Sequence, residues 1–239
     1  MAKYKRVLLK LSGEAMSGED GIINFSFVEE ISKVIKRCKE EGVVFGIVIG
    51  GGNIWRGAVG VQVERSRSDH MGMLATVINS LAMQDMLIKC GVDARVMTAL
   101  DMQRVAENYS QFKANEYLDQ GKTVIIACGT GNPYFSTDTG ALLRAAEIHA
   151  DVAMLAKNID GVYDSDPKKN PSAKKYDAVT YEELLEKNLR IIDSAASSLG
   201  IENNIKSLIF ALKSPENIYK AVMGEDVGTI VKGRKNNET

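Results

Sequence analysis

Residues 43–57 read VVFGIVIGGGNIWRG, an apolar run that passes directly into Gly50, Gly51 and Gly52. The apolar part predicts a buried strand. Glycines leave backbone N–H groups uncovered, and a helix that begins just beyond them would direct its positive end to the same place. This arrangement suits a phosphate group. An ordinary strand-to-helix turn, which needs only one glycine, is the alternative.

The glycine run is not a dinucleotide-binding fingerprint. If Gly50 and Gly52 are its first two glycines, Trp55 stands where the third would fall. A P-loop is also excluded, because the sequence Gly121-Lys122-Thr123 has Glu116 in place of the required first glycine. The identity of the phosphate ligand must therefore come from other segments.

Composition predicts a globular α/β chain with no general attraction to nucleic acid or to membranes. Of 239 residues, 45% are hydrophobic and 26% are charged, and Lys+Arg at 30 against Asp+Glu at 31 give a net charge of −1. A chain of this length predicts one large domain, here residues 1–239. Because the charges balance, any anion site must be local.

The N-terminal region does not resemble a signal peptide. Its apolar run at residues 7–11 is short and contains Lys10, and no later apolar run is expected to reach the length of a membrane span. Cys38, Cys90 and Cys128 lie far apart without a C-x-x-C pair, which favours buried reduced thiols over a disulfide or a zinc site. We therefore expect a cytoplasmic protein with no resident metal site.

Strand and helix patterns alternate along the chain. Strands are expected at residues 4–11, 43–49, 93–99, 122–128, 152–156, 205–212 and 228–231. A capping-box pair, Ser26 and Glu29, predicts the start of a first helix that Gly42 ends. Further helices are expected at residues 68–89, 111–120, 139–149 and 215–223, and a short strand running into a helix at 177–185. The alternation predicts an α/β fold, a three-layer α/β/α sandwich around a mainly parallel sheet.

Four polar segments follow predicted strands. They are Lys10 with Ser12 and Gly13, and residues 50–53, 129–138 and 157–166. Ligands of parallel sheets bind beyond the carboxyl ends of the strands, so we expect these segments to converge on one electropositive pocket. Taken singly, Lys10 is either an edge charge or a functional cation. Residues 129–138 are either a second anion site or an ordinary loop that caps the next helix.

A carboxylate and a close acidic pair also stand out. Asp193 follows two isoleucines and precedes small residues, which predicts a carboxylate at a helix N-terminus with capping as its simplest role. Asp164 and Asp166 resemble a calcium loop only superficially, because Pro167 follows and the glycine and glutamate of such a loop are missing.

Five motifs together point to a known family. They are KLSGE at residues 10–14, GGGN at 50–53 with RG at 56–57, DHMGMLAT at 69–76, GTGNPYFSTD at 129–138, and DGVY at 160–163 with DP at 166–167. The sequence resembles the bacterial uridylate (UMP) kinases, a branch of the amino acid kinase superfamily, over residues 4–231. The first two motifs are shared with acetylglutamate, aspartate and carbamate kinases. The segments at 69–76 and 129–138 are more specific to the uridylate branch.

The resemblance implies a nucleoside monophosphate kinase that transfers the γ-phosphoryl group of ATP to UMP in pyrimidine nucleotide biosynthesis, with Mg²⁺ delivered by ATP. It implies catalytic roles for Lys10, Arg56 and Asp193, with Asp193 orienting Lys10. The ATP-binding residues would be Lys10, Leu11, Ser12, Gly13, Gly52, Arg56, Lys157, Asn158, Tyr163 and Asp166. The UMP-binding residues would be Gly51, Asp69, Thr130, Gly131, Asn132, Pro133, Tyr134, Phe135, Ser136 and Thr137.

The resemblance also implies a homohexamer that GTP activates and UTP inhibits, with the helix at residues 68–89 in a subunit interface. The family's arginine and histidine effector contacts appear here as Gln84 and Ile88, although Arg95 is retained, which predicts a weakened or altered GTP response. The pair Lys157-Asn158 replaces a threonine-lysine pair of part of the family, so the adenine contacts there stay open.

Two other functions are compatible with the same fold. One is a kinase of a carboxylate or carbamate substrate, which the two branch-specific segments disfavour. The other is a nucleotide-binding storage or regulatory protein without transfer activity. Retention of Lys10, Arg56 and Asp193 speaks against this second alternative.

Overall fold

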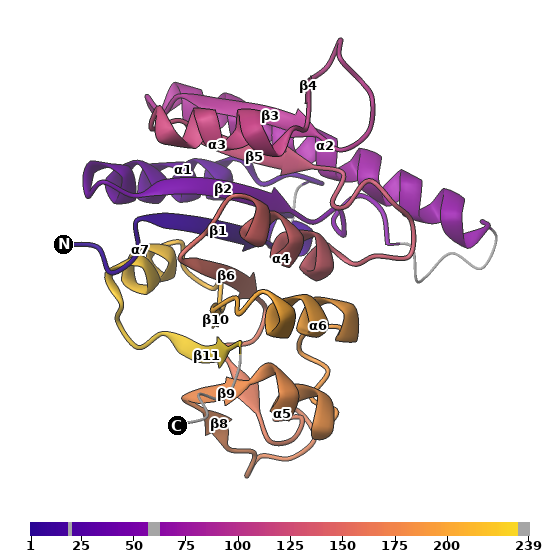
Figure 1. The fold of residues 1–239 in the computed structure, drawn as a ribbon, viewed down its shortest axis with the longest axis vertical. Helices are drawn as coiled ribbons and strands as arrows, with labels where there is room; N and C mark the ends of the chain where they lie inside the picture. The colour runs from indigo at the N-terminus through magenta and orange to yellow at the C-terminus, as the bar shows by residue number, and fades with distance from the viewer. Residues whose placement is uncertain (19–20, 57–62, 234–239) are drawn as a thin grey trace.

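A mainly parallel sheet runs through the whole molecule (Figure 1). The computed structural model describes residues 1–18, 21–56 and 63–233. In this part of the chain nine strands form one sheet in the order β4-β3-β5-β2-β1-β6-β10-β11-β9, and only β10 and β11 pair antiparallel. The strands are β1 (Arg6–Leu11), β2 (Val44–Ile49), β3 (Ala94–Thr98), β4 (Glu107–Asn108), β5 (Thr123–Ala127), β6 (Val152–Lys157), β9 (Ala178–Thr180), β10 (Ser207–Ala211) and β11 (Gly228–Lys232).

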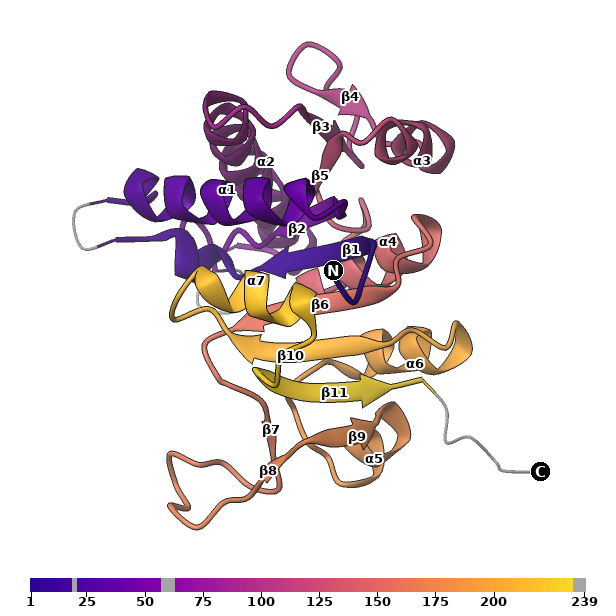
Figure 2. The same ribbon diagram turned by 90° about the vertical axis from the view of Figure 1, so that its left-hand side faces the viewer.

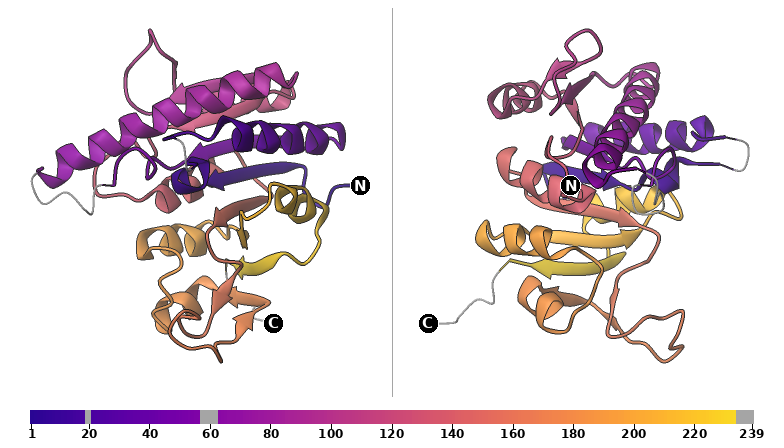
Figure 3. Two further views of the ribbon diagram at one scale, coloured as in Figure 1. Left: turned by 180° about the vertical axis from the view of Figure 1, so that it is seen from behind. Right: turned by 90° about the vertical axis from the view of Figure 1, so that its right-hand side faces the viewer.

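Helices cover both faces of this sheet (Figure 2). One face carries α1 (Phe25–Glu40), α2 (Arg65–Lys89) and α7 (Glu216–Met223), and Figure 3 shows α1 and α2 side by side on it. The other face carries α3 (Gln111–Asp119), α4 (Thr137–Glu147), α5 (Tyr181–Glu186) and α6 (Ser194–Glu202). A short 3₁₀ helix, η1 (Gly13–Met16), follows β1, and β7 (Val162–Tyr163) pairs antiparallel with β8 (Lys175–Tyr176) outside the main sheet. The three-layer α/β/α prediction is confirmed.

The central strand β1 shows why the sheet is buried on both faces. Val7, Leu9 and Leu11 pack into the core under α1 and α7, whereas Leu8 packs into the core under α4. Successive side chains alternate between the two faces, so a strand between two helical layers is apolar throughout. Lys10 is the exception: it is only 8% exposed, on a strand that lies between β2 and β6. Lys10 is therefore not an edge charge, and its ammonium group needs a partner inside the protein.

One local prediction is wrong. The N-cap of α1 is Asn24, whose side chain accepts a hydrogen bond from the N–H of Phe27 at 3.1 Å, so Ser26 lies within the first turn and forms no capping box. The N–H of Asn24 bonds the carbonyl of Met16 at 2.7 Å, which fixes the chain in extended form just before the helix.

In the described residues the glycine run is followed by a turn and not directly by a helix. Residues 51–55 form a single turn, in which the N–H groups of Ile54 and Trp55 bond the carbonyl of Gly51 at 3.0 and 2.9 Å. The next helix in the described part of the chain is α2. Within residues 50–56 the glycine run therefore offers the N–H groups of a turn and not those of a helix terminus.

By length and mean hydropathy, α2 is long and apolar enough to cross a membrane, which the sequence was not expected to show. It packs instead against α1, β3 and β5, and it contributes Met83 and Leu87 to the core. We interpret α2 as a core helix of a globular protein.

Candidate active site

The predicted polar segments lie at one edge of the sheet, where β1, β2, β5 and β6 end. This edge is the side of the sheet formed by the carboxyl ends of these parallel strands, not an edge strand. Lys10 pairs in register with Val48 of β2 and Leu155 of β6, so the connections that follow these strands start at the same level. The N–H of Gly50 then bonds the carbonyl of Leu11 at 3.0 Å, which joins the glycine run to the turn after β1. The parallel topology thus brings distant segments together, as the strand-end argument predicts.

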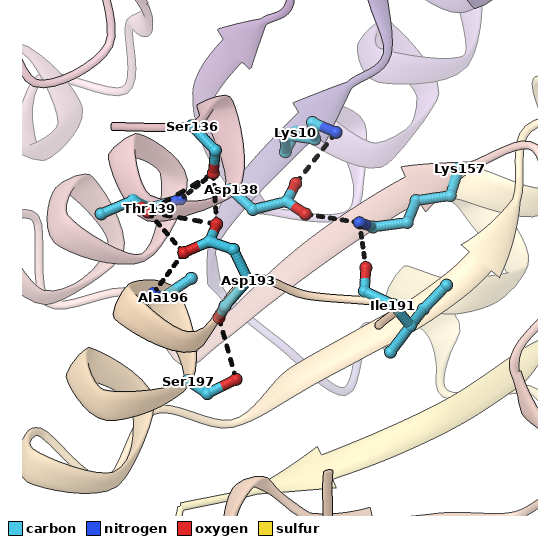
Figure 4. A network of polar contacts seen from close by, with 9 residues as sticks. All are labelled: Lys10, Ser136, Asp138, Thr139, Lys157, Ile191, Asp193, Ala196 and Ser197. Carbon is cyan, nitrogen blue, oxygen red and sulfur yellow. Dashed lines mark hydrogen bonds and ion pairs between the residues drawn. The ribbon is translucent and has the colours of Figure 1, made fainter. Parts of the chain in front are cut away.

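Three charged side chains form a buried cluster at this edge (Figure 4). The Nζ of Lys10 lies 3.0 Å from Oδ1 of Asp138, and the Nζ of Lys157 donates a hydrogen bond of 2.5 Å to Oδ2. Lys157 also donates to the carbonyl of Ile191 at 2.5 Å. The three charged side chains are 11%, 13% and 15% exposed for Lys10, Asp138 and Lys157. Strand β1, the first turn of α4 and the end of β6 each supply one of them.

The cluster is short of negative charge. Burial by itself would raise the pKa of Asp138, but the two lysines outweigh burial and hold the pKa below its usual value. For Lys157, burial and the nearby Lys10 lower the pKa, and the carboxylates of Asp138 and, more weakly, Asp193 offset this only in part. We take the pair as ionised, since Asp138 has two cations beside it. A second anion, such as a phosphate group, would complete the charge balance.

Sequence reasoning missed Asp138 as a site residue and assigned Lys157 to a nucleoside pocket. Asp138 lies in the first turn of α4, where a carboxylate has an ordinary role beside the helix dipole. Lys157, like Lys10, is a lysine at the end of an apolar strand, and this shared pattern could have indicated that the two lysines lie in one cluster.

Asp193 caps α6, as its sequence context predicts, and it also binds α4. Its Oδ1 accepts from the N–H of Ala196 at 2.9 Å and from the hydroxyl of Thr139 at 3.0 Å. Ser136, the N-cap of α4, donates to the other oxygen. Lys10 is paired with Asp138 and not with Asp193, so an orienting role of Asp193 would have to pass through α4, which carries Asp138.

Close packing explains two glycines at the glycine run. A Cβ on Gly13 would lie 2.7 Å from the nitrogen of Gly52 and 2.8 Å from Oδ1 of Asn53. A Cβ on Gly51 would lie 2.7 Å from the carbonyl oxygen of Gly72, in the middle of α2. Distances below 3 Å leave no room for a side chain, so these glycines allow the backbones of three segments to approach one another.

A cavity of about 570 Å³ lies between the glycine run, α2 and the loop after β5. Of the predicted UMP-binding residues it is lined by Gly51, Asp69, Thr130, Asn132, Phe135, Ser136 and Thr137, together with Gly52. Gly131, Pro133 and Tyr134 do not line it. The backbone N–H of Tyr134 bonds Oδ2 of Asp69 at 2.8 Å, which ties the loop to α2. The loop at residues 130–137 thus forms one wall of the cavity.

Two further hollows lie near this cavity. One of about 510 Å³ is lined by Asp138, Lys157 and Asp193 and shares Ser136 with the first cavity. Another of about 490 Å³ is lined by Tyr163 and Asp166 and shares Ile191 with the second hollow. The shared walls place the three in a row, whereas a single pocket was expected from the sequence.

Several predicted site residues do not line these hollows. Lys10 and Arg56 line none of the three, and neither do Leu11, Ser12 and Gly13. Arg56 forms a 2.7 Å ion pair with Glu14, which does line the cavity of about 570 Å³. Asn158 donates to the other oxygen of Glu14 at 3.2 Å and does not line the hollow at Tyr163. Gly57, which follows Arg56 in the motif, lies outside the described residues.

The residues that the structure describes contain no group of three or more His, Cys, Asp or Glu side chains that could hold a metal ion. The buried carboxylate of Asp138 has an ammonium group on each side, which is unsuitable for a cation.

The profile of the amino acid kinase family matches residues 5–215. Among solved structures, this chain is similar to UMP kinase from Ureaplasma parvum, with 35% identity and a TM-score of 0.91 over 96% of this chain and 99% of that one. It is similar to UMP kinase from Bacillus anthracis, with 37% identity and a TM-score of 0.92 over 97% of each chain. Uridylate kinase from Archaeoglobus fulgidus has 30% identity and a TM-score of 0.73 over 94% of this chain and 99% of that one. The chain belongs to the amino acid kinase family and, within it, to the branch of the UMP kinases.

Proposed function

We propose that this protein transfers the γ-phosphoryl group of ATP to UMP, giving UDP and ADP, in pyrimidine nucleotide biosynthesis. The observation that carries the proposal is the cluster of Lys10, Asp138 and Lys157, in which two buried cations share one carboxylate beside a row of cavities. The similarity to UMP kinases supports UMP as the acceptor.

The reaction requires positive charge more than it requires a base. The second pKa of a phosphate monoester is about 6, so UMP is largely ionised near neutral pH and can attack without losing a proton to the protein. Two anions must instead be brought together, and charge on the transferring group must be stabilised. Lys10 and Lys157 supply buried positive charge, and Arg56 supplies an exposed guanidinium group beside Glu14.

The row of cavities supports an end-to-end arrangement of the two nucleotides. UMP would occupy the cavity between Gly51, Asp69 and the loop at residues 130–137, where oxygen and nitrogen atoms of the loop are available to the uracil and the ribose. The ATP nucleoside would occupy the hollow at Tyr163 and Asp166. Its phosphates, with Mg²⁺ as part of the ATP substrate, would reach the hollow at Lys157 between the two.

A coupled assay of ADP release tests this function against its alternatives. The purified protein is incubated with MgATP and, in separate reactions, with UMP, CMP, N-acetylglutamate and aspartate. Release with UMP in clear excess over the others is expected. Release with N-acetylglutamate or aspartate would identify a carboxylate kinase. If none of the four acceptors causes ADP release while UMP still binds, the protein would be identified as a binding protein.

We further propose a homohexamer in the cytoplasm, formed from one amino acid kinase domain over residues 1–239, with GTP and UTP as possible effectors. Exposed apolar side chains on α2 support a subunit interface there: Leu74, Ile78 and Ile88 are 52%, 51% and 51% exposed. Light scattering coupled to size-exclusion chromatography tests the assembly, since a monomer near 26.1 kDa would contradict it.

A further inference from the structure

The loop that lines the acceptor cavity starts from an unusual backbone turn. Cys128, directly after β5, has φ 67°, and Gly129 has φ 56°. Positive φ is strained for a residue with a side chain, so Cys128 keeps this conformation only if its surroundings fix it. The N–H of Gly131 closes the turn by bonding the carbonyl of Cys128 at 2.8 Å. The direction in which residues 130–137 leave the sheet is set here.

From one face of the sheet, Thr76 of α2 holds this turn. Its hydroxyl oxygen accepts a hydrogen bond from the N–H of Cys128 at 2.8 Å and donates to the carbonyl of Met73 at 2.6 Å. Thr76 is 7% exposed and forms part of the cavity wall. Because the proton of its hydroxyl is used inside α2, the hydroxyl serves the turn and is not a free donor to a ligand.

From the other face, Arg144 of α4 holds the same turn. Its Nη2 donates to the carbonyl of Gly129 at 2.8 Å, and its Nη1 donates to Oε2 of Glu147 at 2.7 Å. The guanidinium carbon lies 4.0 Å from the ring centre of Tyr109, whose hydroxyl donates to Glu147 at 2.6 Å. Arg144 is only 4% exposed. A buried arginine with a paired charge and a stacked ring has one rigid position.

We propose that Thr76 and Arg144 are positioning residues for the acceptor loop, because they lock the Cys128–Gly129 turn from opposite faces of the sheet. This inference rests on the proposed function and assigns to both residues an effect on UMP through the loop, in addition to the place of Thr76 in the cavity wall. Neither residue reaches the hollow at Tyr163 and Asp166. Loosening the turn should therefore weaken UMP binding while ATP binding is preserved.

Three variants of α2 test the first of these residues. Thr76→Val keeps the shape but removes the acceptor of the Cys128 N–H and should raise the KM for UMP about tenfold, with the KM for ATP changed less than about twofold. Thr76→Ser keeps the hydroxyl and should restore the KM for UMP to within about threefold of wild type. Ser80→Ala is the matched control: Ser80 is also fully buried and donates to a carbonyl of the same helix, that of Thr76, at 2.7 Å. It should change neither KM.

Arg144→Lys is the independent variant for the other face. Lysine keeps the positive charge beside Glu147. It lacks the planar guanidinium group that bonds Glu147 and the carbonyl of Gly129 at the same time, so a rise in the KM for UMP alone is again expected. Calorimetric titration of each variant with UMP and with an ATP analogue measures binding apart from turnover. If Thr76→Val does not fold, the KM values and nucleotide binding of Arg144→Lys test the proposal.

The outcomes separate this inference from the proposed function. Wild-type protein that releases no ADP with UMP contradicts the proposed function, whatever the variants do. Wild-type protein that uses UMP, together with Thr76→Val and Arg144→Lys variants whose KM for UMP is unchanged, overturns the inference. A rise in both KM values, or a rise that Thr76→Ser does not reverse, also overturns it, because such a result would indicate general loosening of the fold.

Discussion

The ammonium group of Lys157 donates a 2.5 Å hydrogen bond to Oδ2 of Asp138, and this contact joins the end of β6 to the start of α4. Lys10 lies 3.0 Å from the other oxygen of the same carboxylate. One carboxylate therefore serves two ammonium groups in a site that is largely closed to water. The arrangement is electrostatically incomplete without an anionic substrate, which connects the packing of these residues to phosphoryl transfer.

Replacing Asp138 should damage both stability and turnover. Asp138→Asn leaves Lys10 and Lys157 close together without the carboxylate that both contact, so we expect the free energy of unfolding to fall by about 3 kcal/mol and turnover to fall about 100-fold. Denaturant titration and the ADP-release assay measure the two effects. Asp85→Asn is the control, because Asp85 forms an exposed pair with Lys89 on α2 and should change neither quantity. Full activity of Asp138→Asn would remove Asp138 from the site.

The stabilising effect of Asp138 should depend on pH in one direction. Its pKa in the folded protein is lowered, so its contribution to stability is complete above the ordinary aspartate pKa of about 4 and is lost as the pH falls through the lowered value. The difference in Tm between wild type and Asp138→Asn should thus be largest near neutral pH and shrink in acid. Thermal melts over a series of buffers measure it. A difference that grows on acidification would contradict the ionised pair.

Lys10 should matter for transfer rather than for acceptor binding. Lys10→Met keeps a side chain of similar length in β1 but removes the ammonium group beside Asp138, so turnover should fall at least about 100-fold. UMP affinity, measured by calorimetry, should stay within about threefold of wild type. Lys33→Met, on an exposed pair with Glu29, is the control and should behave like wild type. Loss of UMP binding in Lys10→Met would mean that Lys10 is misassigned.

The sequence predicts the layers and the parallel sheet because its strands are continuous apolar runs separated by helical spacing. The two-residue strands β4, β7 and β8 were not predicted, since two residues have no periodicity to detect. The start of α1 was misplaced because Asn24 and Ser26 are both good N-caps, and only the contact of Asn24 with Met16 decides between them. Strand order depends on pairings between distant segments, which local patterns do not contain.

The same limit applies to the site. The positions of Lys10, the glycine run and the loop after β5 at strand ends were enough to predict that they lie at one edge. The place of Asp138 between Lys10 and Lys157 depends on how α4 packs on the sheet. The spacing of residues in the sequence does not indicate this packing. The division into three adjoining hollows likewise depends on side chains from loops that are far apart in sequence, such as Ser136 and Ile191.

Gly13 should not tolerate even one added carbon. In Gly13→Ala the new Cβ would meet the nitrogen of Gly52 at 2.7 Å, so the turn after β1 and the glycine run must move apart. We expect the KM for ATP to rise about tenfold and turnover to fall by a similar factor, as measured by ADP release at varied ATP. Gly21→Ala is the control, since its nearest neighbour is 4.0 Å away, and it should be silent. Equal behaviour of the two variants would argue against close packing at the glycine run.

Asp69 should act on the acceptor nucleotide. Asp69→Asn keeps an oxygen that can accept from the N–H of Tyr134 but removes the charge and the 3.2 Å ion pair with Arg65. Because Asp69 lines the proposed UMP cavity, we expect the KM for UMP to rise about tenfold while the KM for ATP changes little. Steady-state kinetics at varied UMP and varied ATP separate the two. Unchanged UMP kinetics would remove Asp69 from the acceptor site, and exposed Asp226→Asn serves as the control.

Regulation by GTP should be weak in this protein. The amide of Gln84 donates to the carbonyl of Ala94 at 3.0 Å, Ile88 is 51% exposed and apolar, and Arg95 forms a 3.0 Å ion pair with Asp93. The family resemblance predicts arginine and histidine effector contacts at these two positions of α2. Here they hold a neutral amide that bonds within the protein and an exposed aliphatic side chain, neither of which attracts a triphosphate.

We therefore expect saturating GTP to change UMP-dependent ADP release by less than about twofold. The double variant Gln84→Arg, Ile88→His should respond more strongly to GTP, because it restores positive charge and hydrogen-bond donors on the same face of α2. Its rate without GTP is the internal control and should match that of wild type. Strong activation of the wild-type protein at low GTP would show that Arg95 or other residues are sufficient for effector binding, and that the two departures on α2 are immaterial.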